Sequence, residues 1–155
     1  MSKSLKRVMH ALTEAGVDIT PLELGPETRT AQQAAHAADC ALDQIAKSVI
    51  FCGETTGEAI LFVTAGGNQV DPAKASALAG EPLGKADAAL IRAQTGFAIG
   101  GVAPIGHLNP IRAFFDPRLA DFDVIFAAAG TPRHIFPIDP QVLIKISGAQ
   151  PADFA

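Results

Sequence analysis

The stretch VIFCGETTGEAILFVTA, residues 49–65, is the clearest indication of the fold. Its two ends, residues 49–52 and 59–65, are apolar and rich in β-branched residues, as buried strands are. The glycines at 53 and 57 predict a tight turn between them, so the stretch forms a β-hairpin. Strand-like and helix-like segments are interspersed along the chain without regular crossover helices between the strands. We therefore expect an α/β (α+β) fold with a mixed, mostly antiparallel sheet and flanking helices, rather than a doubly wound parallel sheet.

The remaining elements follow from hydrophobic periodicity and capping residues. These predict helices over residues 4–15, 30–38, 42–47, 71–79, 87–96 and 139–148. Further strands are expected over residues 17–24, 111–115 and 122–129, the first at a sheet edge because Pro21 interrupts it. No repeat, low-complexity tract or linker divides the 155 residues, which are the length of one ordinary domain. Residues 1–155 are therefore expected to form a single domain.

Composition narrows the class of protein and its partners. Hydrophobic residues make up 48% of the chain and charged residues 18%, a mixture that suits a packed core. With a formal net charge of −4, any contact with nucleic acid has to be local, and we expect no DNA partner. No apolar run reaches the roughly 18 residues of a membrane span, so no membrane association is expected. Cys40 and Cys52 fit reduced thiols in a cytoplasmic protein, and a bridge between them is the alternative.

A glycine-rich run is the strongest local sign of function. It reads TGFAIGGVAPIGH over residues 95–107 and includes Gly100, Gly101, Val102, Ala103 and Pro104. Consecutive glycines let a ligand approach the main chain, and exposed amides in such a turn can stabilise a developing oxyanion. The other interpretation is a purely structural turn between a helix and a strand, and the turn taken alone favours it.

Lys47 is the second candidate, at the end of the predicted helix over residues 42–47. A lysine there can hold a phosphate or a carboxylate at the mouth of a site. The alternative is a solvated lysine, which the dipole at a helix C-terminus also favours. The signatures of serine hydrolases, nucleotide-binding loops and zinc peptidases are absent, and the four histidines are scattered. We expect neither a metal nor a cofactor.

Four blocks of the chain, in order, resemble the YbaK/ProX family of free-standing aminoacyl-tRNA deacylases. The first is TAQQAA at 30–35 with QIAKSVIF at 44–51, and the second is AGGNQVD at 65–71 followed by Lys74. The third is TG at 95–96 with GGVAPIG at 100–106, and a weaker fourth is AAAG at 127–130. The blocks span roughly residues 30–148, and their joint occurrence is far more specific than any one of them.

The resemblance implies a small editing domain, similar to the one inserted in bacterial prolyl-tRNA synthetases, that hydrolyses the ester of a mischarged tRNA in trans. It maps the lysine of the family to Lys47 and its G-x-x-x-P loop to residues 100–104, with Lys47, Gly100 and Gly101 as the catalytic residues. An aminoacyl ester is already activated, so the catalyst mainly has to place it, polarise its carbonyl and position water. The resemblance also implies help from a ribose hydroxyl of the terminal adenosine, which explains the absence of a catalytic triad.

The predicted substrate is the acceptor end of a mischarged tRNA that carries a small amino acid, such as Ala, Ser, Thr, Cys or a non-protein analogue. An aminoacyl-tRNA synthetase is a second candidate partner. The residues predicted to bind the substrate are Thr30, Ser48, Val102, Ala103, Pro104 and His134. His134 is equally well explained as a surface histidine after a strand. Two other functions stay open, namely a non-enzymatic module that binds nucleic acid or protein, and an esterase for small metabolites.

Overall fold

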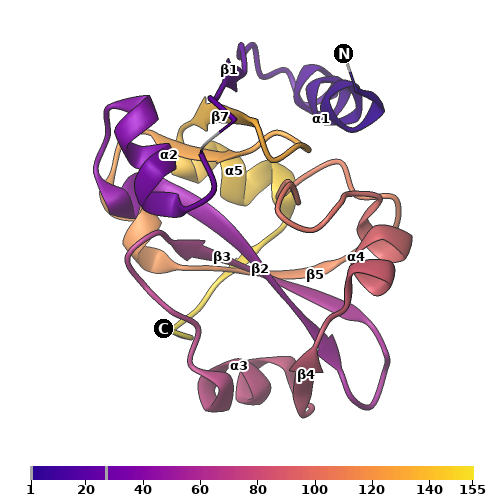
Figure 1. The fold of residues 1–155 in the computed structure, drawn as a ribbon. Helices are drawn as coiled ribbons and strands as arrows, with labels where there is room; N and C mark the ends of the chain where they lie inside the picture. The colour runs from indigo at the N-terminus through magenta and orange to yellow at the C-terminus, as the bar shows by residue number, and fades with distance from the viewer. Residues whose placement is uncertain (1, 27) are drawn as a thin grey trace.

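An eight-stranded sheet runs through the computed structural model, which describes residues 2–26 and 28–155. Its order is β1-β7-β6-β2-β3-β5-β8, and β4 pairs with β2 beside that path (Figure 1). Four of the seven strand pairings are antiparallel and three are parallel, which confirms the mixed, mostly antiparallel sheet. The strands are β1 (Leu22–Glu23), β2 (Ile45–Gly53), β3 (Ala59–Ala65), β4 (Leu83–Lys85), β5 (Arg112–Phe115), β6 (Ile125–Ala128), β7 (His134–Ile138) and β8 (Gln150–Pro151).

Helices flank the sheet on both faces. They are α1 (Lys3–Glu14), α2 (Ala31–Ala38), α3 (Pro72–Ala79), α4 (Ala88–Thr95) and α5 (Pro140–Ser147), with 3₁₀ helices at Leu42–Gln44 and Pro117–Asp121. Because successive side chains of a strand point to opposite faces of the sheet, those of β3 contribute to two hydrophobic cores. Leu61 and Val63 belong to the larger core, to which α1, α4 and α5 contribute. Ile60 and Phe62 lie on the opposite face, against α3.

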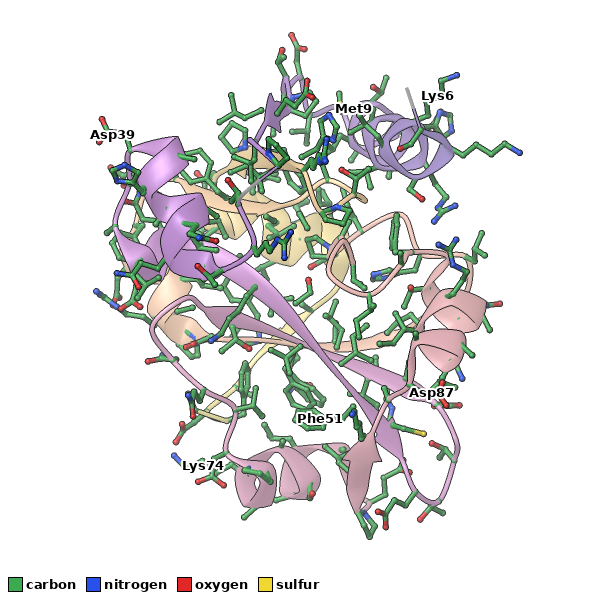
Figure 2. All side chains as sticks on the ribbon, viewed as in Figure 1. Lys6, Met9, Asp39, Phe51, Lys74 and Asp87 are labelled. Carbon is green, nitrogen blue, oxygen red and sulfur yellow. The ribbon has the colours of Figure 1, made fainter. Side chains whose placement is uncertain are left out.

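Phenylalanines fill the core under α3. The ring of Phe62 lies 5.7, 5.3 and 5.1 Å from those of Phe51, Phe114 and Phe154, measured between centroids. Phe51 lies between the sheet and α3 (Figure 2). Phe154 is only 1% exposed, so the C-terminal segment is an integral part of this core. No helix in the described part of the chain has both the length and the apolar character of a membrane span.

The central strand β2 has an interrupted outer edge. On one side it pairs with β3 along residues 46–52. On the other side β6 pairs only with Ile45 and Ala46, and β4 only with residues 51–53. A gap in the sheet therefore lies beside residues 47–50, and this gap positions the site described below.

The helix predicted over residues 42–47 is wrong. Only Leu42–Gln44 form a 3₁₀ turn, and β2 already begins at Ile45. Ile45 and Ala46 are buried and pair with β6, and Ala46 also pairs with β3. Ile45 is β-branched and itself favours a strand. Lys47 therefore lies within a strand. The predicted strand over residues 17–24 shrinks to β1. Three strands were not predicted, because β4 and β8 are only three and two residues long and β7 contains Pro137.

Candidate functional site

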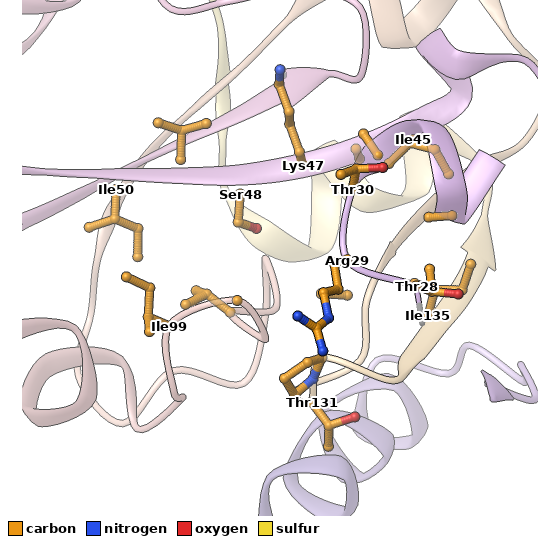
Figure 3. A pocket seen from close by; sticks show the side chains of 18 of the residues that line it. Thr28, Arg29, Thr30, Ile45, Lys47, Ser48, Ile50, Ile99, Thr131 and Ile135 are labelled. Carbon is orange, nitrogen blue, oxygen red and sulfur yellow. The ribbon is translucent and has the colours of Figure 1, made fainter. Parts of the chain in front are cut away.

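A cavity of about 740 Å³ opens at the gap beside β2. Its lining includes the segment before α2, the strand β2, the loop after α4 and the turn after β6 (Figure 3), together with residues of α2, α4, β6 and β7 and of the segment at residues 85–86. Of the residues predicted from the sequence, the cavity brings together Thr30, Lys47, Ser48, Gly100, Val102 and His134. Their roles in catalysis or binding stay predictions.

Lys47 and Ser48 point to opposite sides of β2, as strand alternation requires (Figure 3). The Lys47 ammonium donates a hydrogen bond to the carbonyl of Gly66 at 3.4 Å, so it lies at the turn after β3. Ser48 faces the loop that carries Ile99. Its Oγ is buried and has no hydrogen-bond partner among the described residues.

The two adjacent glycines of the loop differ in their surroundings. Gly100 has a φ of +89°, which favours glycine, and a Cβ there would meet no atom within 4 Å. A Cβ at Gly101 would lie 2.8–3.0 Å from the backbone of Thr131 and Pro132. The N–H of Gly101 already donates to the carbonyl of Ala98 at 3.0 Å. Gly101 therefore allows close packing of two loops, and its amide is not free for a substrate.

The residues on either side of Gly101 have backbone amides without an acceptor among the described residues. The N–H groups of Gly100 and Val102 have no acceptor within residues 2–26 and 28–155, and both residues line the cavity. Ala103 is fully buried, and its carbonyl oxygen lies 2.7 Å from His107 Nε2. Pro104 has no N–H and lines a second cavity of about 470 Å³ on the other side of the loop. Neither Ala103 nor Pro104 lines the first cavity.

Two further polar groups at the cavity are already engaged. Thr30 caps α2, and its side-chain oxygen accepts the N–H of Gln33 at 3.1 Å. Thr131 Oγ1 accepts the N–H of Arg133 at 3.2 Å and lies 2.6 Å from His134 Nδ1. A hydroxyl that donates to Nδ1 satisfies all three groups, so we assign the proton of the neutral His134 ring to Nε2. His134 then presents an N–H donor.

The cavity is locally basic although the chain is acidic. Arg29, Lys47 and Lys85 line it, and the described lining residues include no aspartate or glutamate. Sequence reasoning did not select Arg29, Lys85 or Thr131. Only Thr131 had a local signal, because it stands three residues before His134 in a turn.

Helix α1 supports the loop from behind. Arg7 Nε donates to the carbonyl of Gly106 at 2.8 Å, and the Arg7 guanidinium lies 4.5 Å from the centre of the Phe97 ring. The ring of His107 meets Phe97 edge to face. Burial lowers the pKa of His107 below its ordinary value of 6.5, the hydrogen bond with Ala103 raises it, and the charge of Arg7 lowers it. Arg7 and His107 thus hold the loop without reaching the cavity.

Comparison with known proteins identifies the class to which this arrangement belongs. The family model described as the aminoacyl-tRNA editing domain matches residues 25–146 of the chain. The uncharacterized protein YwhH of Bacillus subtilis (strain 168) is 31% identical over 144 residues, which cover 93% of this chain and 91% of that protein.

Solved structures give the same result for the fold. A crystal structure of a candidate trans-editing enzyme for prolyl-tRNA synthetase is 43% identical, with a TM-score of 0.92, and the match covers 99% of this chain and 98% of that one. The hypothetical protein APE2540 is 24% identical and shares the fold, with a TM-score of 0.86 over 96% of this chain and 98% of that one.

Proposed function

The chain belongs to the aminoacyl-tRNA editing domain family, and on this basis we propose that it is a trans-editing hydrolase. Its substrate would be a mischarged tRNA carrying a small amino acid, such as Ala, Ser, Thr, Cys or an analogue. The observation that carries the proposal is the cavity beside β2, where unpaired backbone amides and basic side chains meet. The likeness to a candidate trans-editing enzyme for prolyl-tRNA synthetase favours tRNA charged by that synthetase.

The reaction needs no protein nucleophile. Water attacks the carbonyl carbon of the ester, the bond to the ribose oxygen breaks, and that oxygen takes up a proton to give free tRNA and the amino acid. Negative charge develops on the carbonyl oxygen, and the amides of Gly100 and Val102 are the donors proposed to stabilise it. A neighbouring ribose hydroxyl of the terminal adenosine is proposed to position the water. Holding these groups together supplies much of the acceleration.

The basic groups fit the acceptor end of tRNA. Arg29 lies on the Ser48 side of β2 and Lys47 on the other side (Figure 3). Together with Lys85 they line the cavity and can contact the phosphates that precede the terminal adenosine. Such local contacts need no positive net charge. His134, with its Nε2 proton, is proposed to donate to the aminoacyl group, and the cavity wall limits the size of the amino-acid side chain.

The test is deacylation of a panel of mischarged tRNAs by the purified protein. We expect fast hydrolysis of one small aminoacyl-tRNA and slow hydrolysis of the cognate prolyl-tRNA. Tight binding of tRNA without turnover would favour the non-enzymatic module. Hydrolysis of simple esters without activity on aminoacyl-tRNA would favour the esterase for small metabolites.

A further inference from the structure

Among the outward-facing residues of β2, Ser48 lies farthest from the strands that pair with its outer edge. In an antiparallel pair, the N–H and C=O of one residue point toward the partner strand, and those of the next residue point away from it. The N–H of Gly53 donates to Glu58 across the hairpin, and the carbonyl of Val63, opposite Ser48, accepts the N–H of Asp116 on the far side of β3. The outward-facing residues of β2 are therefore Ala46, Ser48, Ile50 and Cys52.

Ser48 lies outside both sets of strand pairings on the outer edge of β2, the one with β6 and the one with β4. Ala46 pairs with β6 and Cys52 with β4, whose ladder begins at Phe51. Ser48 is two residues past the first ladder and three before the second, so no strand among the described residues pairs with its outward N–H and C=O. Ser48 lines the cavity, and backbone N–H and C=O groups inside a protein are rarely left without partners.

We propose, on the basis of the proposed function, that the aminoacyl group occupies this gap as a single added strand residue. Its α-amino group donates to the carbonyl of Ser48, and its ester carbonyl oxygen accepts the N–H of Ser48. The amino and carbonyl groups of an aminoacyl ester have the spacing of one residue, which an antiparallel hydrogen-bonded pair requires. Ser48 N–H then acts on the same oxygen as the amides of the glycine loop.

The acceptors available at the cavity agree with this arrangement. Because the described lining residues include no carboxylate, a carbonyl is the natural acceptor for the amino group. Residues paired across strands place their side chains on the same face, so the substrate side chain lies beside the unpartnered Oγ of Ser48. Ile50 and Ile99 line the cavity close to Ser48, so the substrate side chain would meet apolar groups there.

The experiment compares each aminoacyl-tRNA of the mischarged panel with its des-amino counterpart, for example alanyl-tRNA with propionyl-tRNA. Single-turnover rates are divided by the uncatalysed rates, because the amino group also activates the ester. We expect the des-amino substrate to lose at least about tenfold, as in sites built to bind a donor that the analogue lacks. Equal corrected rates would overturn the inference while leaving the proposed function intact. Failure to hydrolyse any aminoacyl-tRNA would overturn both.

A variant distinguishes binding by the main chain of Ser48 from binding by its side chain. Ser48→Ala keeps both peptide groups, so the ratio between the two substrates should stay within about threefold of the wild-type ratio. Loss of that discrimination in Ser48→Ala would assign the amino group to Oγ and overturn the strand-like arrangement. Ser76→Ala on α3 is the matched control and should leave both rates unchanged. A crystal structure with 3′-alanylamino-3′-deoxyadenosine should show both hydrogen bonds at about 2.7–3.2 Å.

Discussion

Among the predicted site residues, Lys47 differs most between its predicted position, at the end of a helix, and its position in the structure. It lies in β2, with its ammonium at the Gly66 carbonyl and on the side of the strand opposite Ser48. A contact to phosphate from this position is a charge-assisted hydrogen bond, worth about 1.5–3 kcal/mol.

We expect Lys47→Ala to lower kcat/KM for the mischarged substrate by about 10- to 100-fold. Lys145→Ala, at the exposed end of α5, is the matched control and should keep wild-type kinetics. Single-turnover deacylation measures both variants, and a near-normal rate for Lys47→Ala would remove the lysine from the mechanism.

His107 gives the protein a pH dependence of stability. Its pKa in the folded state is lowered, chiefly by burial. The unfolded chain therefore takes up the proton first as the pH falls, and the free energy of unfolding decreases from about pH 7.5 downward through 6.5. Urea unfolding at about pH 7.5 and about pH 5.5 should show a smaller decrease for His107→Gln than for the wild type.

The control for His107→Gln is His10→Gln. The side chain of His10 is 74% exposed on α1, so its replacement should change the free energy of unfolding at about pH 7.5 by less than about 0.5 kcal/mol. If His107→Gln and the wild type lose the same stability between the two pH values, the buried neutral histidine is not the cause.

At the scale of elements, two loops meet at the cavity, and Gly101 lets them touch. Gly101→Val would push side-chain carbons into the backbone of Thr131 and Pro132. We expect at least a tenfold loss of deacylation, because a displacement of about 1 Å in positioning groups can cost about a hundredfold. Gly148→Ala, at a helix end with open space around it, should cost about 1 kcal/mol of stability and leave activity unchanged. Full activity of Gly101→Val would contradict this packing role.

Helix α1 contacts the same loop through Arg7, although Arg7 and Gly106 are 99 residues apart in the sequence. Arg7→Met keeps the apolar stem but loses the hydrogen bond to Gly106 and the contact with Phe97. We expect kcat to fall several-fold while KM changes little, since Arg7 holds the loop and does not line the cavity. Lys3→Met on the exposed face of α1 is the control for the change of charge. A rise in KM alone would indicate that Arg7 binds tRNA instead.

Sequence patterns predicted those helices and strands whose formation depends on residues that are close together in the chain. The hairpin of β2 and β3 and the caps at Asp71, Asp87 and Asp139 followed directly from the residues present. The helix predicted at residues 42–47 failed because Ile45 and Ala46 pair with β6, which lies about 80 residues later. The gap beside Ser48 was beyond prediction, since it depends on where two distant ladders end. The contact of Arg7 with Gly106 was hidden for the same reason.

For the molecule as a whole, the C-terminus closes a core that is separate from the cavity. Phe154 packs on Phe62, and its carbonyl accepts the N–H of Asp71 at 2.7 Å. Phe154→Ala should lower the free energy of unfolding by about 3–5 kcal/mol, measured by urea denaturation, and leave the deacylation rate of the folded fraction unchanged.

The neighbouring charge at the C-terminus provides the control. Asp153, whose side chain is 81% exposed, pairs with Lys74 at 3.2 Å, so Asp153→Ala should change stability by less than about 1 kcal/mol. Equal effects of the two variants would mean that the tail is held by charge rather than by its aromatic ring.

The interrupted edge of β2 has a consequence for solubility. A row of free N–H and C=O groups on a strand is a template for joining other chains and starting aggregates. Here the open segment is only residues 47–50, enclosed between β6 and β4 at the floor of a cavity with basic groups in its walls. So short and recessed an edge gives a foreign strand little room to pair. The gap beside β2 is therefore a weaker template for aggregation than a long open edge strand.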